Sequence, residues 1–257
     1  IAENAGSSLT LTATSSIISG SDITVSIDSS GSATEGTDYG TISDITISAG
    51  STTGTTTFTP TDDSMYETST DETTTLAIGS VSGGGATENG SQSVTITIEE
   101  NDSPPTVTLT ASSSSIEENS SSSLTLTATL SNSTSADVTV SIGTSGSATE
   151  GTDYSTISDI TISSGDTTGT VSFTPTDDSL YETSTDETAT VSITGVSGGS
   201  ATENGSQSVT LTIEENESAP TVTLTTSSSS IDENSGSILT LTATLSVATT
   251  ADVTVSI

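Results

Sequence analysis

The chain lacks several residue types, and these absences limit its chemistry. None of its 257 residues is cysteine, lysine, arginine, histidine or tryptophan, and its aromatic residues are four tyrosines and two phenylalanines. Without cysteine there is no disulfide and no thiolate metal site. A Ser-His-Asp triad cannot form without histidine, nor a phosphate-binding P-loop without lysine. Paired carboxylates could hydrolyse glycosides, but the aromatic platforms that line such clefts are scarce. We therefore do not expect an enzyme.

The 34 acidic residues have no cationic side chain in the chain to balance them, which gives a net charge of −34. Nucleic acid is an unsuitable partner because phosphate backbones are bound through lysine and arginine. An anionic membrane surface is unsuitable for the same reason. No apolar run approaches the roughly 18 residues of a membrane span. The carboxylates must be screened by salt, held by backbone N–H groups or neutralised by bound metal.

The sequence repeats itself after 115 residues without insertion or deletion. Ile1-Ala2-Glu3-Asn4 recurs as Ile116-Glu117-Glu118-Asn119 and again as Ile231-Asp232-Glu233-Asn234. This period is too long for a solenoid and suits a whole small domain in an array. We predict a first repeat at 1–103 with a truncated first strand, a complete repeat at 104–218, and the start of a third at 219–257. The chain starts inside a repeat and without methionine, so we expect it to be part of a longer protein.

Apolar and polar residues alternate throughout the complete repeat, as they do in strands with one dry face and one wet face. No window shows a 3.6-residue apolar period. Clusters of Gly, Ser, Asn, Asp and Pro separate the alternating segments. The pattern predicts an all-β fold, a tandem of seven-stranded, immunoglobulin-like antiparallel β-sandwiches. The seven predicted strands are Thr106–Thr110, Leu124–Leu130, Val138–Ile142, Ile160–Ile162, Val171–Phe173, Ala189–Ile193 and Val209–Ile213.

The wet faces of these strands are mostly threonine and serine. Threonine is β-branched and suits a pleated surface, which explains its abundance without a ligand. Flat rows of threonine could alternatively bind ice or a glycan, and the sequence leaves this open.

Several acids follow strand ends that an antiparallel sandwich places at one pole. Seven carboxylates would then meet without a cation, which raises pKa values or attracts hard divalent ions. Ca²⁺ accepts six to eight oxygen ligands and tolerates flexible loops, whereas Zn²⁺ prefers His or Cys. For Glu150, Asp159, Asp186 and Glu203 we favour a simpler role, keeping strand edges soluble. The seven predicted to converge are Glu118, Asp153, Asp177, Asp178, Glu182, Glu214 and Glu215.

A family resemblance follows from the order of four motifs. Ile-x-Glu-Asn, Gly-Thr-Asp-Tyr, Asp-Asp-Ser-Leu-Tyr-Glu and a closing Ile-Glu-Glu-Asn resemble the Calx-beta domain over the whole repeat. Calx-beta domains are seven-stranded sandwiches, and some hold a Ca²⁺ cluster at one end. The closing run is Glu-Glu-Asn here rather than all Asp, so fewer or weaker ions are expected. The resemblance implies that the ligands are the seven acids above with the Leu180 carbonyl in the complete repeat, Glu3, Asp38, Asp62, Asp63, the Met65 carbonyl, Glu67, Glu99 and Glu100 in the first, and Glu233 in the third.

The sequence thus predicts a structural segment of a secreted adhesin stalk or extracellular fibre, located outside the cell or on its surface. Calcium ions near the junctions between repeats would make it rigid, because the linker Asn216–Pro220 is short and contains proline. Identical chains in a fibre are possible partners. The alternative is a calcium-dependent adhesion module that binds a glycan or a protein through its loops. Variation between repeats, heaviest at Ser15–Gly20 against Leu130–Ser135, hints at that alternative.

Overall fold

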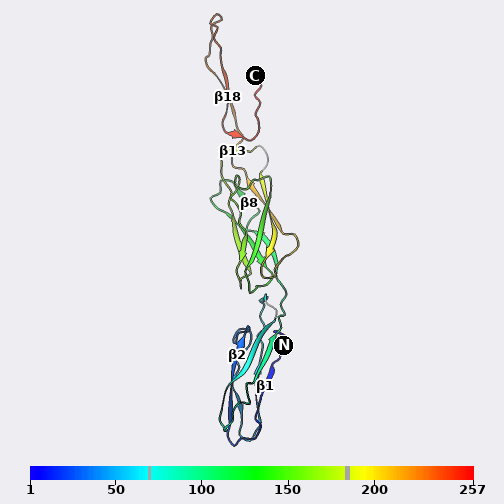
Figure 1. The fold of residues 1–257 in the computed structure, drawn as a ribbon. Helices are drawn as coiled ribbons and strands as arrows, with labels where there is room; N and C mark the ends of the chain where they lie inside the picture. Colours follow the sequence, from blue (N-terminus) through cyan, green and yellow to red (C-terminus); the bar gives the residue numbers. More distant parts are fainter. Residues whose placement is uncertain (69–70, 183–185) are drawn as a thin grey trace. The chain divides into compact units, whose positions relative to one another are not determined.

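The computed structural model describes residues 1–68, 71–182 and 186–257. The chain divides into two compact units (Figure 1). One contains Ile1–Pro105 with Ser131–Asp137, and the other contains Thr106–Leu130 with Val138–Ile257. The residues described are strands, turns and irregular segments, and none is assigned to an α-helix. They therefore include no helix with the length and hydrophobicity of a membrane span.

Two sheets build the sandwich of the second unit. The first sheet has the order β11-β10-β14-β16-β8 and the second the order β12-β9-β7-β15. All seven predicted strands of this repeat are present, which confirms the antiparallel sandwich. Among the described residues of these two sheets, the parallel pairings are those of the short strands, β8 with β16 and β15 with β7. The strands are β7 (Thr106–Ala111), β8 (Ser115–Glu117), β9 (Leu124–Leu130), β10 (Val138–Gly146), β11 (Ile160–Ile162), β12 (Thr168–Phe173), β14 (Glu187–Ser197), β15 (Thr202–Glu203) and β16 (Ser208–Glu214).

The core of this sandwich follows from the alternation of its strands. Along β9 the apolar side chains are buried while Thr125 is exposed. Tyr154 and Phe173 are fully buried, with ring centroids 4.8 Å apart. On the wet face, the hydroxyls of Thr190 and Thr210 hydrogen-bond across two strands at 3.1 Å. Paired hydroxyls of this kind are a common way to stabilise an antiparallel pair.

The first unit repeats this architecture. Glu72 lies opposite Ile98 just as Glu187 lies opposite Ile213, so the register is identical 115 residues apart. The bulge in the longest strand pair is also repeated, between Ser26 and Ile27 and again between Ser141 and Ile142. Its two sheets have the orders β3-β2-β5-β6 and β1-β4. The strands are β1 (Leu9–Thr14), β2 (Ile23–Gly31), β3 (Ile45–Ile47), β4 (Thr53–Phe58), β5 (Glu72–Ser82) and β6 (Ser93–Ile98).

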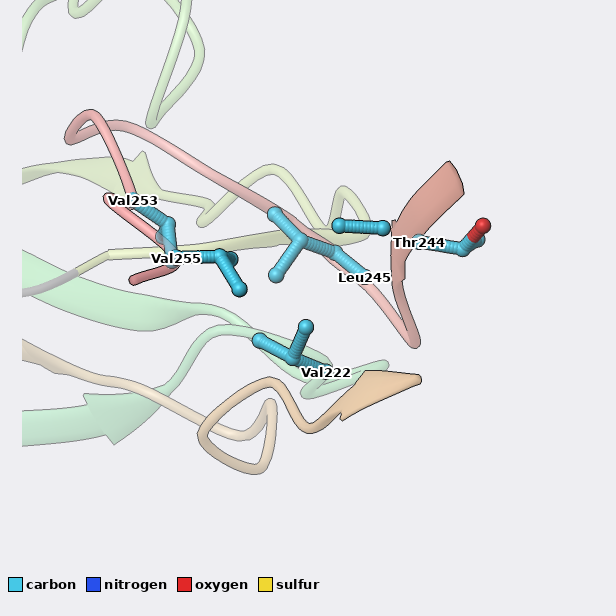
Figure 2. Close-up of a pocket in the computed structure, with 6 residues that line it drawn as sticks. Val222, Thr244, Leu245, Val253 and Val255 are labelled. Atoms are coloured by element: carbon cyan, nitrogen blue, oxygen red, sulfur yellow. The ribbon is translucent and has the colours of Figure 1, made fainter. Parts of the chain in front are cut away.

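The third repeat begins as a hairpin of β17 (Val222–Thr226) and β18 (Leu241–Leu245). Its register matches the β7–β9 pair, but its apolar face is open. Leu224 is 54% exposed, whereas its counterpart Leu109 is 4% exposed. The strands β14 and β16 that cover this face in the complete repeat have no counterpart within residues 219–257. Figure 2 shows the resulting open pocket, lined by Val222, Ala243, Thr244, Leu245, Val253 and Val255.

Candidate metal centre

In each unit, one of the predicted acidic ligands lies on the Gly-Thr-Asp-Tyr turn. Gly151 has a φ of +84°, a conformation that glycine adopts without steric cost. The second and third positions after this glycine place Asp153 on the turn and bury Tyr154 in the core. Asp153 accepts a hydrogen bond from the Thr149 N–H at 2.5 Å, which fixes its carboxylate. The same turn in the first unit has Gly36 at φ +88° and an acid, Asp38, bound in the same way.

The turn is attached to the segment that carries the adjacent aspartates. Tyr154 forms an antiparallel bridge with Pro175, and the Thr176 N–H donates to the Asp153 carbonyl at 2.9 Å. Asp177 and Asp178 follow directly. The buried tyrosine therefore holds both acidic loops at the same end of the sandwich.

Among the described residues, the acids gather into two groups in each complete or nearly complete sandwich. Within a group, each residue offers one ligand atom and these atoms lie within 4.8 Å of one another. Each group combines side chains from segments far apart in the sequence. In the second unit the groups are Asp153, Glu182 and Glu187, and Glu118, Glu215 and Glu217; in the first they are Asp38, Glu67 and Glu72, and Glu3, Glu100 and Asp102.

Backbone hydrogen bonds join the two groups of the second unit. The Glu182 N–H donates to Glu215 Oε2 at 2.7 Å, so a residue of one group is bound to a residue of the other. The Asp178 N–H donates to Glu118 Oε1 at 3.2 Å, and the Glu217 N–H donates to Glu215 Oε1 at 2.8 Å. All of these acids therefore lie at one pole of the sandwich. The first unit has the equivalent bond from the Glu67 N–H to Glu100 Oε2, at 2.6 Å.

Burial, together with the neighbouring negative charges, makes several of these carboxyls hard to ionise. Burial raises the pKa of Glu118 to about 7, and the negative charges of Glu217, Asp178 and Glu215 add to the effect, against the hydrogen bond from the Asp178 N–H. Burial, followed by the charges of Asp153 and Glu182, raises the pKa of Glu187 to about 7. With pKa values of about 7, these groups are only partly ionised at neutral pH unless a cation compensates the charge.

The first unit shows the same electrostatics. Burial is again the largest cause that raises the pKa of Glu3 to about 7, with the charges of Asp63 and Glu100 adding to it. The pKa values of Glu67 and Glu72 also rise to about 7, chiefly through burial. Two copies of the repeat thus concentrate uncompensated charge at the same place.

Glu215 differs from its neighbours. Burial opposes its ionisation, but hydrogen bonds donated by the N–H groups of Glu217 and Glu182 outweigh it and lower its pKa. A carboxylate that accepts several N–H groups is held in its charged form. Glu215 is therefore the fixed negative charge around which the second group is arranged.

Three of the four groups also hold a buried carboxylate oxygen with no hydrogen-bond partner among the described residues. These are Glu72 Oε2, Asp102 Oδ2 and Glu217 Oε2. A buried acceptor without a partner is costly, and a charged one more so. Several carboxylate oxygens pointing at one another, with none of the nitrogen or sulfur ligands of zinc, fit a hard cation such as Ca²⁺. These oxygen ligands therefore fit Ca²⁺, the ion that the sequence predicts.

The predicted ligands fall into three classes: those within an acid group, those beside one, and those outside. It brings together Glu3, Asp38, Glu67, Glu100, Glu118, Asp153, Glu182 and Glu215 within the acid groups. It places Asp63 and Asp178 beside those groups, through their N–H bonds to Glu3 and Glu118. The charge of Asp177 acts on Glu217 and that of Asp62 on Asp102, so both are near.

The remaining predicted ligands are not gathered into an acid group. Glu99 and Glu214 stand next to Glu100 and Glu215, and adjacent residues of an extended chain point to opposite sides. Met65 lies in a loop and Leu180 begins the short strand β13 (Leu180–Tyr181). The N–H of each donates to the aspartate two residues earlier, Asp63 or Asp178, at 2.6 Å. Glu233 is exposed in the third repeat, and no acid group found among the described residues contains it.

Sequence reasoning missed four members of the groups, namely Glu72, Asp102, Glu187 and Glu217. Their signal was present, because each is acidic in both repeats. It was hidden because 14 of the 15 acids in residues 1–115 are also acidic in the next copy. Retention therefore could not separate a ligand from a soluble edge. Only the strand register, which puts Glu187 opposite Ile213 at the end of β16, shows that it faces the pole.

The fold and the acidic poles define this chain as a tandem of all-β domains with candidate metal centres at their ends. The family model of the Calx-beta domain matches residues 9–102 and 100–217. The chain therefore belongs to the Calx-beta domain family, as its motifs predicted. A comparison with curated proteins finds no match.

Solved structures with similar folds include tandem and single domains. "Crystal structure of CBD12 from CALX1.2" is 15% identical, with a TM-score of 0.36 over 83% of this chain and 95% of that one. "Crystal structure of Apo-form Calx CBD1 domain" is 16% identical, with a TM-score of 0.36 over 43% of this chain and 98% of that one. "Crystal structure of invasin: a bacterial integrin-binding protein" is 17% identical, with a TM-score of 0.38; the match covers 93% of this chain and 43% of that one.

Proposed function

We propose that each sandwich binds Ca²⁺ at its acidic pole and that the chain is a structural segment of a secreted adhesin stalk or extracellular fibre. The observation that carries the proposal is the pair of acid groups in each unit, with ligand atoms within 4.8 Å. The sequence supplies no cationic side chain for them. Bound ions would neutralise this charge and tie together loops from four parts of the sequence.

Ca²⁺ is favoured over other ions by the type of ligand. All candidates are oxygens on loops and strand ends, which suit the large and flexible shell of Ca²⁺ better than the strict octahedron of Mg²⁺. Asp62, Asp63, Glu99, Asp177, Glu214 and Glu233 are proposed as further ligands, with the carbonyls of Met65 and Leu180. Glu72, Asp102, Glu187 and Glu217 join this set.

The mechanical role rests on where the ions would bind. Glu217 belongs to an acid group and also to the short linker that precedes the third repeat. An ion there would immobilise the first residues of the junction. The negative surface and the repeat of nearly identical domains suit an extended, soluble array.

Thermal unfolding of the 257-residue chain with Ca²⁺ and with chelator tests the proposal. A ligand at about 100 times its Kd adds about 2.7 kcal/mol to the free energy of unfolding. For a domain of about 100 residues this shifts Tm upward by about 10 °C or more. The control is KCl at matched ionic strength, because screening alone also relieves repulsion. Equal Tm values in Ca²⁺ and in KCl would remove the metal from the proposal.

The stalk role has its own test. Electron micrographs of the chain should show straighter particles in Ca²⁺ than in chelator. Particles with the same spread of bend angles in both conditions would separate ion binding from any mechanical role.

A further inference from the structure

A short backbone contact recurs beside each acidic pole. In the second unit, β13 (Leu180–Tyr181) pairs in parallel with β19 (Ala248–Thr249), and the Thr250 N–H donates to the Tyr181 carbonyl at 3.2 Å. The partner strand β19 comes from the third repeat, which belongs to the same compact unit. We name this contact the latch.

The same contact occurs 115 residues earlier, within the first unit. Tyr66 forms a parallel bridge with Thr134. The Tyr66 N–H donates to the Ser133 carbonyl at 2.9 Å, and the Ser135 N–H donates to the Tyr66 carbonyl at 3.0 Å. These partners lie in Ser131–Asp137, the segment between β9 and β10 that groups with the first unit. Thr134 is 1% exposed, so the segment is buried at this contact.

The sequences on the two partner segments differ, although the contact is the same. Ser133-Thr134-Ser135 in one latch is replaced by Ala248-Thr249-Thr250 in the other. A contact made by backbone groups tolerates such change, because every residue except proline supplies the same N–H and C=O. The most variable part of the repeat therefore coincides with a docking segment, and its variation needs no external partner to explain it.

The tyrosine of the latch lies between two residues that are bound to the acids. The Leu180 N–H donates to Asp178 Oδ1 at 2.6 Å and the Glu182 N–H donates to Glu215 Oε2 at 2.7 Å. The first unit has the same two bonds from Met65 and Glu67, both at 2.6 Å. Alternate N–H groups of an extended chain point in opposite directions. One edge of this short segment therefore faces the acidic pole and the other faces the docking segment.

We infer that this segment couples ion binding to docking of the next repeat's β9–β10-type loop. The inference rests on the proposed calcium sites. Ions that hold Asp178, Glu182 and Glu215 in place also hold the backbone on which Tyr181 presents its N–H and C=O. Without ions, repulsion between the carboxylates displaces that backbone and loosens the latch. By reciprocity, a chain whose latch is broken binds its ions more weakly.

The substitution Ser135→Pro tests the coupling in the first unit. Proline removes the N–H that donates to the Tyr66 carbonyl. A residue that precedes proline must be extended, and Thr134 already meets this requirement because it forms a β-bridge. Ser135→Ala is the matched control: like the proline variant it removes the hydroxyl that accepts the Thr68 N–H at 3.1 Å, but it keeps the backbone N–H. Thr250→Pro and Thr250→Ala form the same pair in the second unit.

Two measurements on the intact chain read the result. In calorimetric titration with Ca²⁺, each proline variant should bind about two- to tenfold more weakly than its alanine control, the effect of one backbone hydrogen bond. In hydrogen exchange followed after pepsin digestion, Ca²⁺ should slow exchange at Tyr66 and at residues 133–135 in the unmodified chain. This protection should be lost in Ser135→Pro and kept in Ser135→Ala.

The outcomes separate the two proposals. If the unmodified chain takes up no Ca²⁺, the proposed function and the coupling both fail. If it binds Ca²⁺ with equal affinity in the proline and alanine variants, and the latch amides exchange at the same rate with and without the ion, the sites stand and the coupling is overturned. If one proline variant no longer unfolds cooperatively, the test is made with the proline variant of the other unit, Ser135→Pro or Thr250→Pro.

Discussion

At the scale of single residues, Glu187 has opposite effects on the stability of the metal-free and the metal-bound chain. It is the first residue of β14 and shares an acid group with Asp153 and Glu182. Burial and these neighbouring charges raise its pKa, so its ionised form opposes folding when no cation is present. As a ligand it would instead contribute to stability.

Glu187→Gln should therefore raise Tm in chelator at pH 7.5 by a few degrees, because it removes a crowded charge. In saturating Ca²⁺ the same variant should have a lower Tm than the unmodified chain, because one ligand is lost. Asp166→Asn is the control: it removes the same charge at an exposed site outside the acid groups. A variant that melts higher in both conditions would make Glu187 a purely unfavourable charge and not a ligand.

At the scale of strands, alternation alone was enough to predict where the sheets lie. Val138, Val140 and Ile160 alternate with polar residues in the sequence, and all three are fully buried. The pairings of β8, β13 and β15 were not predictable, because strands of two or three residues are too short to show a period. Their partners lie far along the chain, and only the fold brings them together.

The candidate site divides in the same way. Some predicted ligands stand in loops between clearly alternating strands, namely Asp38, Asp153 and the Asp-Asp pairs that begin at Asp62 and Asp177. Their position at one end of the sandwich follows from the antiparallel order of the strands. Glu72 and Glu187 are the first residues of the long strands β5 and β14, where an acid is usually interpreted as a solvated residue. Which member of a Glu-Glu pair faces the pole depends on register, and register is a property of pairing rather than of local sequence.

The end of β10 provides a prediction at this scale. Gly146 has a φ of +136°, and a Cβ added there would lie 2.1 Å from the Thr188 carbonyl oxygen of the neighbouring strand. Gly146→Ala should therefore destabilise the second unit by more than about 2 kcal/mol, through both strain and collision. Chemical denaturation in Ca²⁺ measures the loss. Ser145→Ala, an exposed neighbour in the same strand, should change the free energy of unfolding by less than about 0.5 kcal/mol.

At the scale of the whole molecule, the net charge of −34 makes folding depend on what accompanies the carboxylates. Hydrophobic burial must overcome repulsion that is concentrated at the acidic poles rather than spread evenly. Two agents relieve that repulsion at the same atoms. Protons do so when pH falls, and cations do so when pH is high enough for the carboxylates to ionise.

The two agents give opposite dependences of stability on pH. Glu3, Glu67, Glu72, Glu118 and Glu187 have pKa values raised from 4.5 to about 7 in the folded, metal-free chain. Between these values the folded state holds more protons than the unfolded state, so the free energy of unfolding falls as pH rises. This contribution is complete below about pH 4.5 and lost above about pH 7. In chelator, Tm should therefore decrease across this window.

In saturating Ca²⁺, Tm should instead increase from pH 5 to pH 7.5, because ligand carboxylates must lose their protons before they bind the ion. Calorimetric scans at several pH values, in chelator and in Ca²⁺ at constant ionic strength, would show the two curves diverging as pH rises. Parallel curves would mean that the ion acts only by screening the surface. Diverging curves would locate its action at the carboxyls with raised pKa values, since the pKa of an exposed acid changes little between the unfolded and folded chain.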